Sequence, residues 1–155
     1  LNELRISSTA IREALANDDL TLAEKLLGRP YRILGRVIHG NELGRTIGFP
    51  TANIRLHRQV NPVKGVYAVK VRLKSGAFFN GVANIGTRPT INGVNQLLEA
   101  HLFDFQGDLY GQWLDVELCH KIRDEMKFPS FDDLKAQIAK DVETAKNVFK
   151  TDRTL

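Results

Sequence analysis

Apolar and polar side chains alternate over short stretches between residues 31 and 122, and glycine or proline interrupts these stretches. In the clearest of them, 67–74, four large apolar side chains alternate with alanine, lysine and arginine. Alternation with a period of two is typical of a strand with one buried face. A chain with several such strands and frequent turn residues is expected to fold as an antiparallel barrel or sandwich.

Two more strands are predicted at about 96–105 and 112–119, where leucine, alanine or valine occupies every second position. Ser75-Gly76 predicts a turn after the strand at 67–74, and Gln106-Gly107-Asp108 predicts a hairpin between the two later strands.

Helices are predicted on both sides of this strand-rich region. Residues 1–28 contain Thr21 and Glu24 at the spacing of a capping box, and Gly28 ahead of a proline is a helix stop signal. Residues 131–149 carry an apolar stripe with spacings of three and four, which predicts a helix packed on the strands. The stripe consists of Phe131, Leu134, Ile138, Val142, Ala145 and Phe149.

The composition limits the classes of protein to which the chain can belong. Its 155 residues suit one domain, and no apolar run approaches the roughly 20 residues that a membrane-spanning helix needs. The net charge of +4 is spread along the chain, which argues against nucleic acid as a partner. The lone Cys119 excludes a disulfide framework and a cysteine-based zinc site, and it suits a reducing cytosol, so we expect a cytoplasmic protein. Because the chain begins at Leu1 and its single methionine is Met126, we expect it to be part of a longer or processed chain.

The densest group of candidate functional residues lies in the segment 40–53. Gly40, Gly44 and Gly48 allow a ligand to approach the backbone closely, and amide N–H groups in such a loop can bind phosphate oxygens. The segment lacks the Gly-Lys-Ser/Thr ending of a Walker A loop. A long hairpin loop that contains glycine explains the same pattern, so both interpretations stay open.

Thr51 and Asn53 end this segment, after Pro50. Positions two apart in an extended chain point the same way, and hydroxyl and amide oxygens suit a hard cation such as Mg²⁺. A turn in which both side chains cap nearby backbone groups is the alternative.

Several blocks, in the same order, resemble the riboflavin kinase family. The blocks are 44–54, 62–68, 84–90, 98–105, Leu109-Tyr110-Gly111 and Lys121-Ile122-Arg123, followed by the terminal helix. The resemblance covers roughly residues 30–149. It implies a mostly β fold with helices: a six-stranded antiparallel Greek-key barrel, with a C-terminal helix packed on it and a short helical lead-in. It also implies that ATP is a co-substrate and that its γ-phosphate passes to the 5′-hydroxyl of riboflavin, giving FMN and ADP.

The segment 6–12, Ile-Ser-Ser-Thr-Ala-Ile-Arg, is similar to the closing motif of the FAD synthetase module that precedes the kinase in bifunctional bacterial enzymes. The resemblance therefore implies that residues 1–28 are the helical tail of that module with its linker, and that 29–155 form the riboflavin kinase domain. The full-length partner would be the upstream FAD synthetase module. This chain alone is not expected to convert FMN to FAD.

The resemblance also assigns roles to individual residues. Glu99 matches the catalytic glutamate, and its strand position directs it away from its apolar neighbours. The residues that match the ATP and phosphate site are Gly44, Arg45, Gly48, Pro50, Thr51 and Asn53, of which Thr51 and Asn53 would hold Mg²⁺. Arg123 and Phe128 are expected to contact the flavin.

Other residues are expected to be structural. His101 shares the strand face of Glu99, but a lone histidine is more often a hydrogen-bonded structural group. Phe131 is expected to belong to the helix stripe, and Tyr110 and Trp113 to pack on the barrel or hairpin.

Two other functions remain as alternatives. A non-catalytic flavin-binding barrel would need no loop for ATP and Mg²⁺, and the segment 40–53 argues against it. A nucleic-acid-binding barrel would need a clustered basic face with exposed aromatic side chains, and the even spread of charge argues against that.

Overall fold

The computed structural model describes residues 8–38, 51–56, 63–90 and 93–152. The elements are α1 (Ser8–Ala16), α2 (Leu20–Leu27), β1 (Arg32–Ile38), β2 (Thr51–Leu56), β3 (Gly65–Leu73), β4 (Phe78–Thr90), β5 (Gly93–Leu102), β6 (Trp113–Arg123) and α4 (Phe131–Asp152). No helix among these residues is long and apolar enough to cross a membrane.

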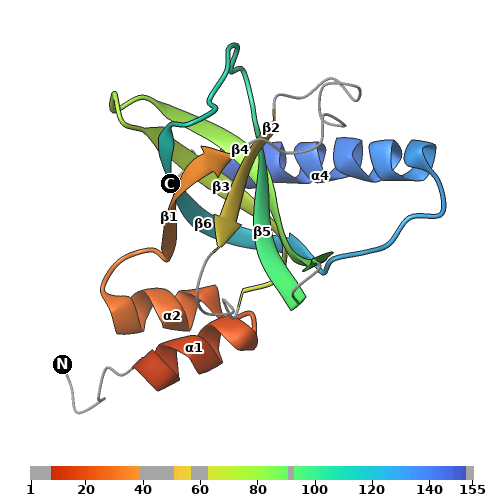
Figure 1. Ribbon diagram of the computed structural model, residues 1–155. Coiled ribbons are helices and arrows are strands. Elements are labelled where there is room, and N and C mark those ends of the chain that lie inside the picture. Colours follow the sequence, from red (N-terminus) through yellow and green to blue (C-terminus); the bar gives the residue numbers. More distant parts are fainter. Residues whose placement is uncertain (1–7, 39–50, 57–62, 91–92, 153–155) are drawn as a thin grey trace.

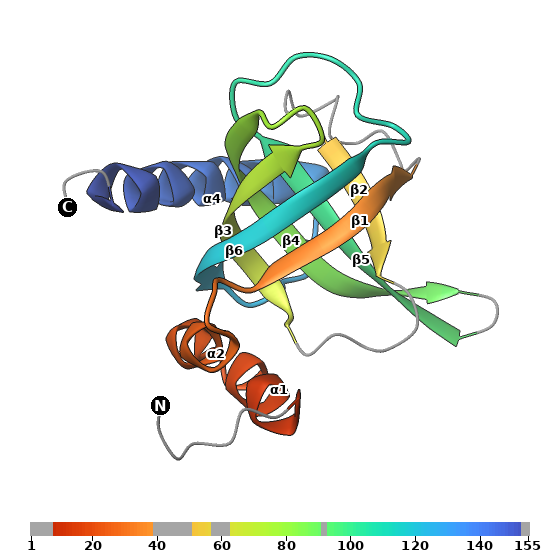
Figure 2. The ribbon, with the colours of Figure 1, turned by 90° about the vertical axis from the view of Figure 1, so that its left-hand side faces the viewer.

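The six strands form a closed barrel in the order β1-β2-β5-β4-β3-β6, and every neighbouring pair is antiparallel (Figures 1 and 2). This confirms the predicted barrel and excludes a sandwich. Alternate side chains of each strand fill the interior, as the period of two predicts. The largest that are fully buried on the strands are Ile54, Tyr67, Val69, Val71, Ile85, Leu98, Leu102, Leu114 and Val116.

The C-terminal helix α4 packs on the outside of the barrel against β3, β4 and β6 (Figure 1). Ser130 caps its start by accepting a hydrogen bond from the Asp133 amide at 3.1 Å. Val142, Ala145 and Phe149 form a second, smaller core with outward-facing residues of β3 and β4. The predicted stripe is therefore confirmed over its C-terminal half.

Two predictions about strand connections have different outcomes. Gly76 adopts a positive φ of 94° in the turn between β3 and β4, as expected for Ser75-Gly76. The hairpin predicted at Gln106-Gly107-Asp108 is wrong, because β5 pairs with β2 and β4 whereas β6 pairs with β1 and β3. The turn residues bend the chain there, but the connection crosses to a strand on the other side of the barrel.

Three aromatic residues that were expected to be structural are partly exposed. Tyr110 is 52% exposed and Trp113 is 53% exposed, and neither lines the described pockets. Phe131 is the first residue of α4 and is 37% exposed, so it does not join the buried part of the stripe.

The helical lead-in is joined to the barrel. Ala14, Leu15, Ala23 and Leu26 belong to the same buried cluster as the barrel interior. Asp19 caps α2 by accepting a hydrogen bond from the Leu22 amide, so the capping box predicted at Thr21 is wrong. The predicted stop at Gly28 is confirmed by its left-handed conformation, with φ of 79°.

An ion pair adds a polar link between the lead-in and β6. Lys121 Nζ lies 2.6 Å from Asp18 Oδ1 and 2.8 Å from Asp124 Oδ1, and it lies over the ring of Tyr67. Burial lowers the pKa of Lys121, but the hydrogen bonds with Asp124 and Asp18 more than offset it, so the pKa is raised above its ordinary value.

We predict that Asp18→Asn lowers the free energy of unfolding by no more than about 1 kcal/mol, because Asp18 is half exposed and such pairs contribute little. Asparagine tolerates the positive φ of 61° at this position, so the substitution isolates the charge. Urea denaturation at low and high salt measures the change, which should shrink in high salt. Asp104→Asn is the matched control, since Asp104 also has a positive φ (59°). Equal losses in the two variants would contradict a role for the ion pair.

Candidate active site

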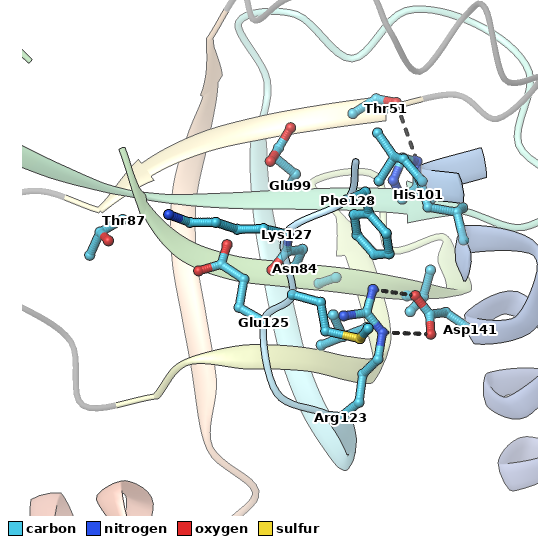
Figure 3. Close-up of a pocket in the computed structure, with 16 residues that line it drawn as sticks. Thr51, Asn84, Thr87, Glu99, His101, Arg123, Glu125, Lys127, Phe128 and Asp141 are labelled. Atoms are coloured by element: carbon cyan, nitrogen blue, oxygen red, sulfur yellow. Dashed lines mark hydrogen bonds and ion pairs between the residues drawn. The ribbon is translucent and has the colours of Figure 1, made fainter. Parts of the chain in front are cut away.

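A pocket of about 540 Å³ lies between the outer face of the barrel and α4, beside the loop that follows β6 (Figure 3). The lining residues come from β2 to β6, from the loop and from α4. They are Thr51, Val66, Val82, Ala83, Asn84, Thr87, Glu99, His101, Arg123, Glu125, Met126, Lys127, Phe128, Leu134, Ile138 and Asp141.

Strand register brings the polar residues of this wall together. Asn53 on β2 is directly opposite Glu99 on β5, and Glu99 is directly opposite Asn84 on β4. Thr51 is opposite His101 in the same way. The intervening β5 residues point into the barrel core, so Glu99 faces outward as predicted. Asn53 is 6% exposed and is not among the lining residues.

His101 is a neutral hydrogen-bonding group. Its Nδ1 lies 3.3 Å from the hydroxyl oxygen of Thr51. Part of its surface faces the pocket, yet burial lowers the pKa of His101 to about 4, and the nearby charge of Asp141 offsets this only in part. The imidazole is therefore uncharged at neutral pH. This agrees with the structural role expected for it.

Arg123 and Asp141 join the end of β6 to α4. Arg123 donates to both carboxylate oxygens of Asp141, from Nε at 2.9 Å and from Nη2 at 2.8 Å. Gln137 donates a further hydrogen bond to Asp141, whose side chain is 4% exposed. A buried carboxylate in this setting is satisfied by charge-assisted donors on both of its oxygens.

The same arginine fixes the first part of the loop. Its Nη1 donates to the carbonyl oxygen of Asp124, and its guanidinium lies 5.8 Å from the ring centroid of Phe128. The structure therefore brings Arg123 and Phe128 to one pocket, together with Glu99 and Thr51 (Figure 3).

Gly86 allows the loop to approach β4. A Cβ atom at this position would overlap the carboxylate of Glu125, so a larger residue would displace that side chain. Glu125 is thus a third carboxylate among the lining residues, besides Glu99 and Asp141 (Figure 3).

Sequence reasoning missed Asn84, Asp141 and Glu125 as residues of the site. Asn84 lies within one of the blocks that carry the resemblance, and a predicted pairing of its strand with that of Glu99 would have found it. No sequence pattern marks Asp141 or Glu125 as a site residue, because only the packing of α4 and of the loop after β6 places them on the pocket wall.

The rest of the predicted phosphate site cannot be compared with the structure. Gly44, Arg45, Gly48 and Pro50 lie outside the described residues. Within the described ranges, no group of three or more His, Cys, Asp or Glu side chains is arranged to hold a metal ion. Thr51 and Asn53 lie two positions apart on β2, and Asn53 is paired with Glu99 of β5. Hydroxyl, amide and carboxylate oxygens are the types of ligand that Mg²⁺ accepts.

A second groove, of about 740 Å³, lies at the other end of α4. It is lined by Phe78, Phe79, Asn80, Phe103, Asp104, Lys146, Phe149 and Lys150. It contains none of the predicted site residues.

Comparison with known proteins assigns the chain to a family. The family model described as "Flavokinase: Riboflavin kinase" matches residues 27–149. The chain belongs to the riboflavin kinase family. Its fold and the order of its sequence blocks agree with this membership.

Two curated relatives are named bifunctional riboflavin kinase/FMN adenylyltransferase. That of Haemophilus influenzae is 79% identical over 151 residues, which cover 97% of this chain and 49% of the relative. That of Escherichia coli K12 is 62% identical over 146 residues, which cover 94% of this chain and 47% of the relative. The chain spans about half the length of the curated relatives it matches, and it matches their C-terminal part.

Two solved structures are similar to this riboflavin kinase family member. A Streptococcus pneumoniae structure described as a macrolide-efflux protein has a TM-score of 0.82 at 41% identity and covers 92% of this chain and 47% of its own. A riboflavin kinase from Trypanosoma brucei has a TM-score of 0.54 at 24% identity and covers 78% of each chain, which supports the fold.

We predict that Asp141→Ala lowers the free energy of unfolding by roughly 3 kcal/mol or more, because it leaves the guanidinium of Arg123 mostly buried without its anion. Chemical denaturation measures the loss. The double variant Arg123→Met/Asp141→Leu should recover most of it, since an apolar pair of similar volume replaces the ion pair. A double variant no more stable than Asp141→Ala would contradict this account of the pair.

Proposed function

We propose that this chain transfers the γ-phosphate of ATP to the 5′-hydroxyl of riboflavin, giving FMN and ADP. The observation that carries the proposal is the position of Glu99. Its carboxylate lies on the wall of a pocket large enough for a small organic ligand, in a chain of the riboflavin kinase family. The names of the relatives from H. influenzae and E. coli support the same reaction.

Glu99 is proposed as the general base. Its carboxylate accepts the proton of the riboflavin 5′-hydroxyl as that oxygen attacks the γ-phosphorus. The new P–O bond forms while the bond from the γ-phosphorus to the bridging oxygen breaks, and ADP leaves with the electron pair. Asn53 and Asn84 flank Glu99 as neutral amides, so neither adds a like charge that would oppose its ionised form.

Thr51 and Asn53 are proposed to hold the Mg²⁺ that accompanies ATP. When bound, this ion would neutralise negative charge on the phosphates. Thr51 is kept in place by its contact with neutral His101. The glycines Gly44 and Gly48, with Arg45 and Pro50, are proposed to form the backbone-lined phosphate site.

The flavin is proposed to lie against the loop after β6. Phe128 offers an aromatic face. Arg123 already donates its Nε, Nη1 and Nη2 groups within the protein, so it would present the face of its guanidinium to the ring. The aliphatic side chains of Leu134 and Ile138 close the pocket from α4.

The domain assignment is likewise a proposal. Residues 1–28 would be the end of an upstream FAD synthetase module and its linker, and 29–155 the kinase domain. The start of the family match at residue 27 supports this boundary. The burial of Leu15 and Leu26 with the barrel core means that the lead-in would also stabilise the kinase domain. A cytoplasmic location stays a prediction.

Incubation with riboflavin, ATP and Mg²⁺, followed by chromatography, tests the proposed function. We expect FMN and ADP to form in equal amounts. With excess ATP and a long incubation, we expect no FAD, because the kinase residues alone would not supply a second nucleotide site. Flavin binding without FMN formation would favour the non-catalytic alternative. Catalytic formation of FAD would contradict the proposed division of the chain.

We predict that Glu99→Gln retains the fold and ligand binding but lowers the single-turnover rate of FMN formation by about 10²- to 10⁴-fold. Glutamine has nearly the same shape but cannot take the proton. Glu125→Gln is the matched control, because it changes another carboxylate of the same pocket and should keep most of the rate. A larger loss in Glu125→Gln than in Glu99→Gln would transfer the role of base to Glu125.

We predict that Thr51→Ala and Asn53→Ala weaken the Mg²⁺-dependent part of ATP binding, because each removes an oxygen ligand. Calorimetric titration with ATP, with and without Mg²⁺, measures this Mg²⁺-dependent part of the affinity. Thr87→Ala, which alters another threonine of the pocket, should leave that part unchanged. Undiminished Mg²⁺-dependent affinity in both variants would remove these residues from the metal site.

A further inference from the structure

Asn84 carries an unsatisfied polar atom in the pocket. Its side-chain oxygen is buried and has no hydrogen-bond partner. Among the described residues that line this pocket, no other buried side-chain oxygen or nitrogen lacks a partner. Buried acceptors in folded proteins are nearly always paired, so an unpaired one in a ligand pocket indicates a donor that the ligand supplies.

The place of Asn84 in the sheet limits what that donor can be. It lies on β4 between Val66 of β3 and Glu99 of β5, and is directly opposite each of them. Directly paired residues on neighbouring strands have Cβ atoms about 4.5–5.5 Å apart. Asn84 and Glu99 are therefore neighbours on one wall of the pocket, where one ligand can contact both (Figure 3).

We propose that Asn84 accepts a hydrogen bond from a secondary hydroxyl of the ribityl chain and so makes the site specific for flavins with a polyol side chain. This rests on the proposed function, in which Glu99 contacts the terminal hydroxyl of that chain. The secondary hydroxyls are the donors next to that terminal group. The other strong donor of riboflavin is the N3–H of the pyrimidine ring, which is separate from the ribityl chain carried by N10 of the central ring.

The chemistry of an amide suits this role. A neutral oxygen can accept from a hydroxyl without adding negative charge beside Glu99, whereas a carboxylate there would place a like charge next to the base. A site with a buried acceptor discriminates strongly against an analogue that lacks the matching donor, because that acceptor then stays unpaired.

Binding of three flavins tests the proposal. Riboflavin has the secondary hydroxyls and the ring N3–H. 10-(5-Hydroxypentyl)-flavin keeps the terminal hydroxyl and the N3–H but lacks the secondary hydroxyls. 3-Methylriboflavin keeps all the hydroxyls but lacks the N3–H. Flavin fluorescence gives each dissociation constant without turnover, and FMN formation from riboflavin by the unaltered chain tests the proposed function separately. We expect the unaltered chain to prefer riboflavin over the hydroxypentyl flavin by about 10- to 100-fold.

Asn84→Leu has nearly the same shape and removes the acceptor. It should reduce the preference for riboflavin over the hydroxypentyl flavin at least 10-fold and leave the preference over 3-methylriboflavin unchanged. Asn80→Leu is the matched control, because it alters an asparagine of the same strand that does not line this pocket, and it should change neither ratio. Asn84→Ala serves the same purpose if the leucine variant does not fold.

Three outcomes would overturn the proposal. Equal weakening of all three flavins in the Asn84 variants would show a structural role. Unchanged affinity for all three would show no role in flavin binding. A loss confined to the preference over 3-methylriboflavin would place Asn84 against the ring instead.

Discussion

Pairing of β5 with β2 on one side and β4 on the other is the constraint on which the site depends. It places Glu99 between Asn53 and Asn84, so that residues of three different strands lie side by side. A shift of one residue in either register would turn Glu99 into the barrel core and Leu98 outward. That shift would bury a carboxylate among apolar side chains, so the core that stabilises the fold also fixes the orientation of the proposed base.

The opposite wall of the pocket depends on one ion pair. Helix α4 contacts the barrel through small and apolar side chains in its C-terminal half. At the middle of the helix, Asp141 accepts hydrogen bonds from Arg123 at the end of β6. Arg123 also holds the Asp124 carbonyl and lies near Phe128, so the loop that closes the pocket begins from a fixed point. The two walls are thus built by different forces: strand pairing and burial for one, and a buried charge pair for the other.

Much of this could be predicted from the sequence. The alternation in 67–74 and the apolar stripe of α4 are local sequence patterns. Each shows which face of its strand or helix is buried. The outward orientation of Glu99 followed from the same rule. The hairpin at Gln106-Gly107-Asp108 failed because turn residues describe the local backbone and not which strands pair across a closed barrel. Asp141 and Glu125 could not be found, since their positions in the pocket are set by tertiary packing. The phosphate segment around Gly44 and Gly48 rests on resemblance alone.

The proposed reaction requires the flavin to bind between β4, β5 and the loop after β6. Backbone amide NMR during titration with riboflavin tests this placement, because the described part of the chain also offers a second groove, at the other end of α4. We expect the chemical-shift changes to cluster at Asn84, Glu99, His101 and residues 124–128. Shifts that cluster instead around the second groove, at Phe78, Phe103 and Lys146, would contradict it.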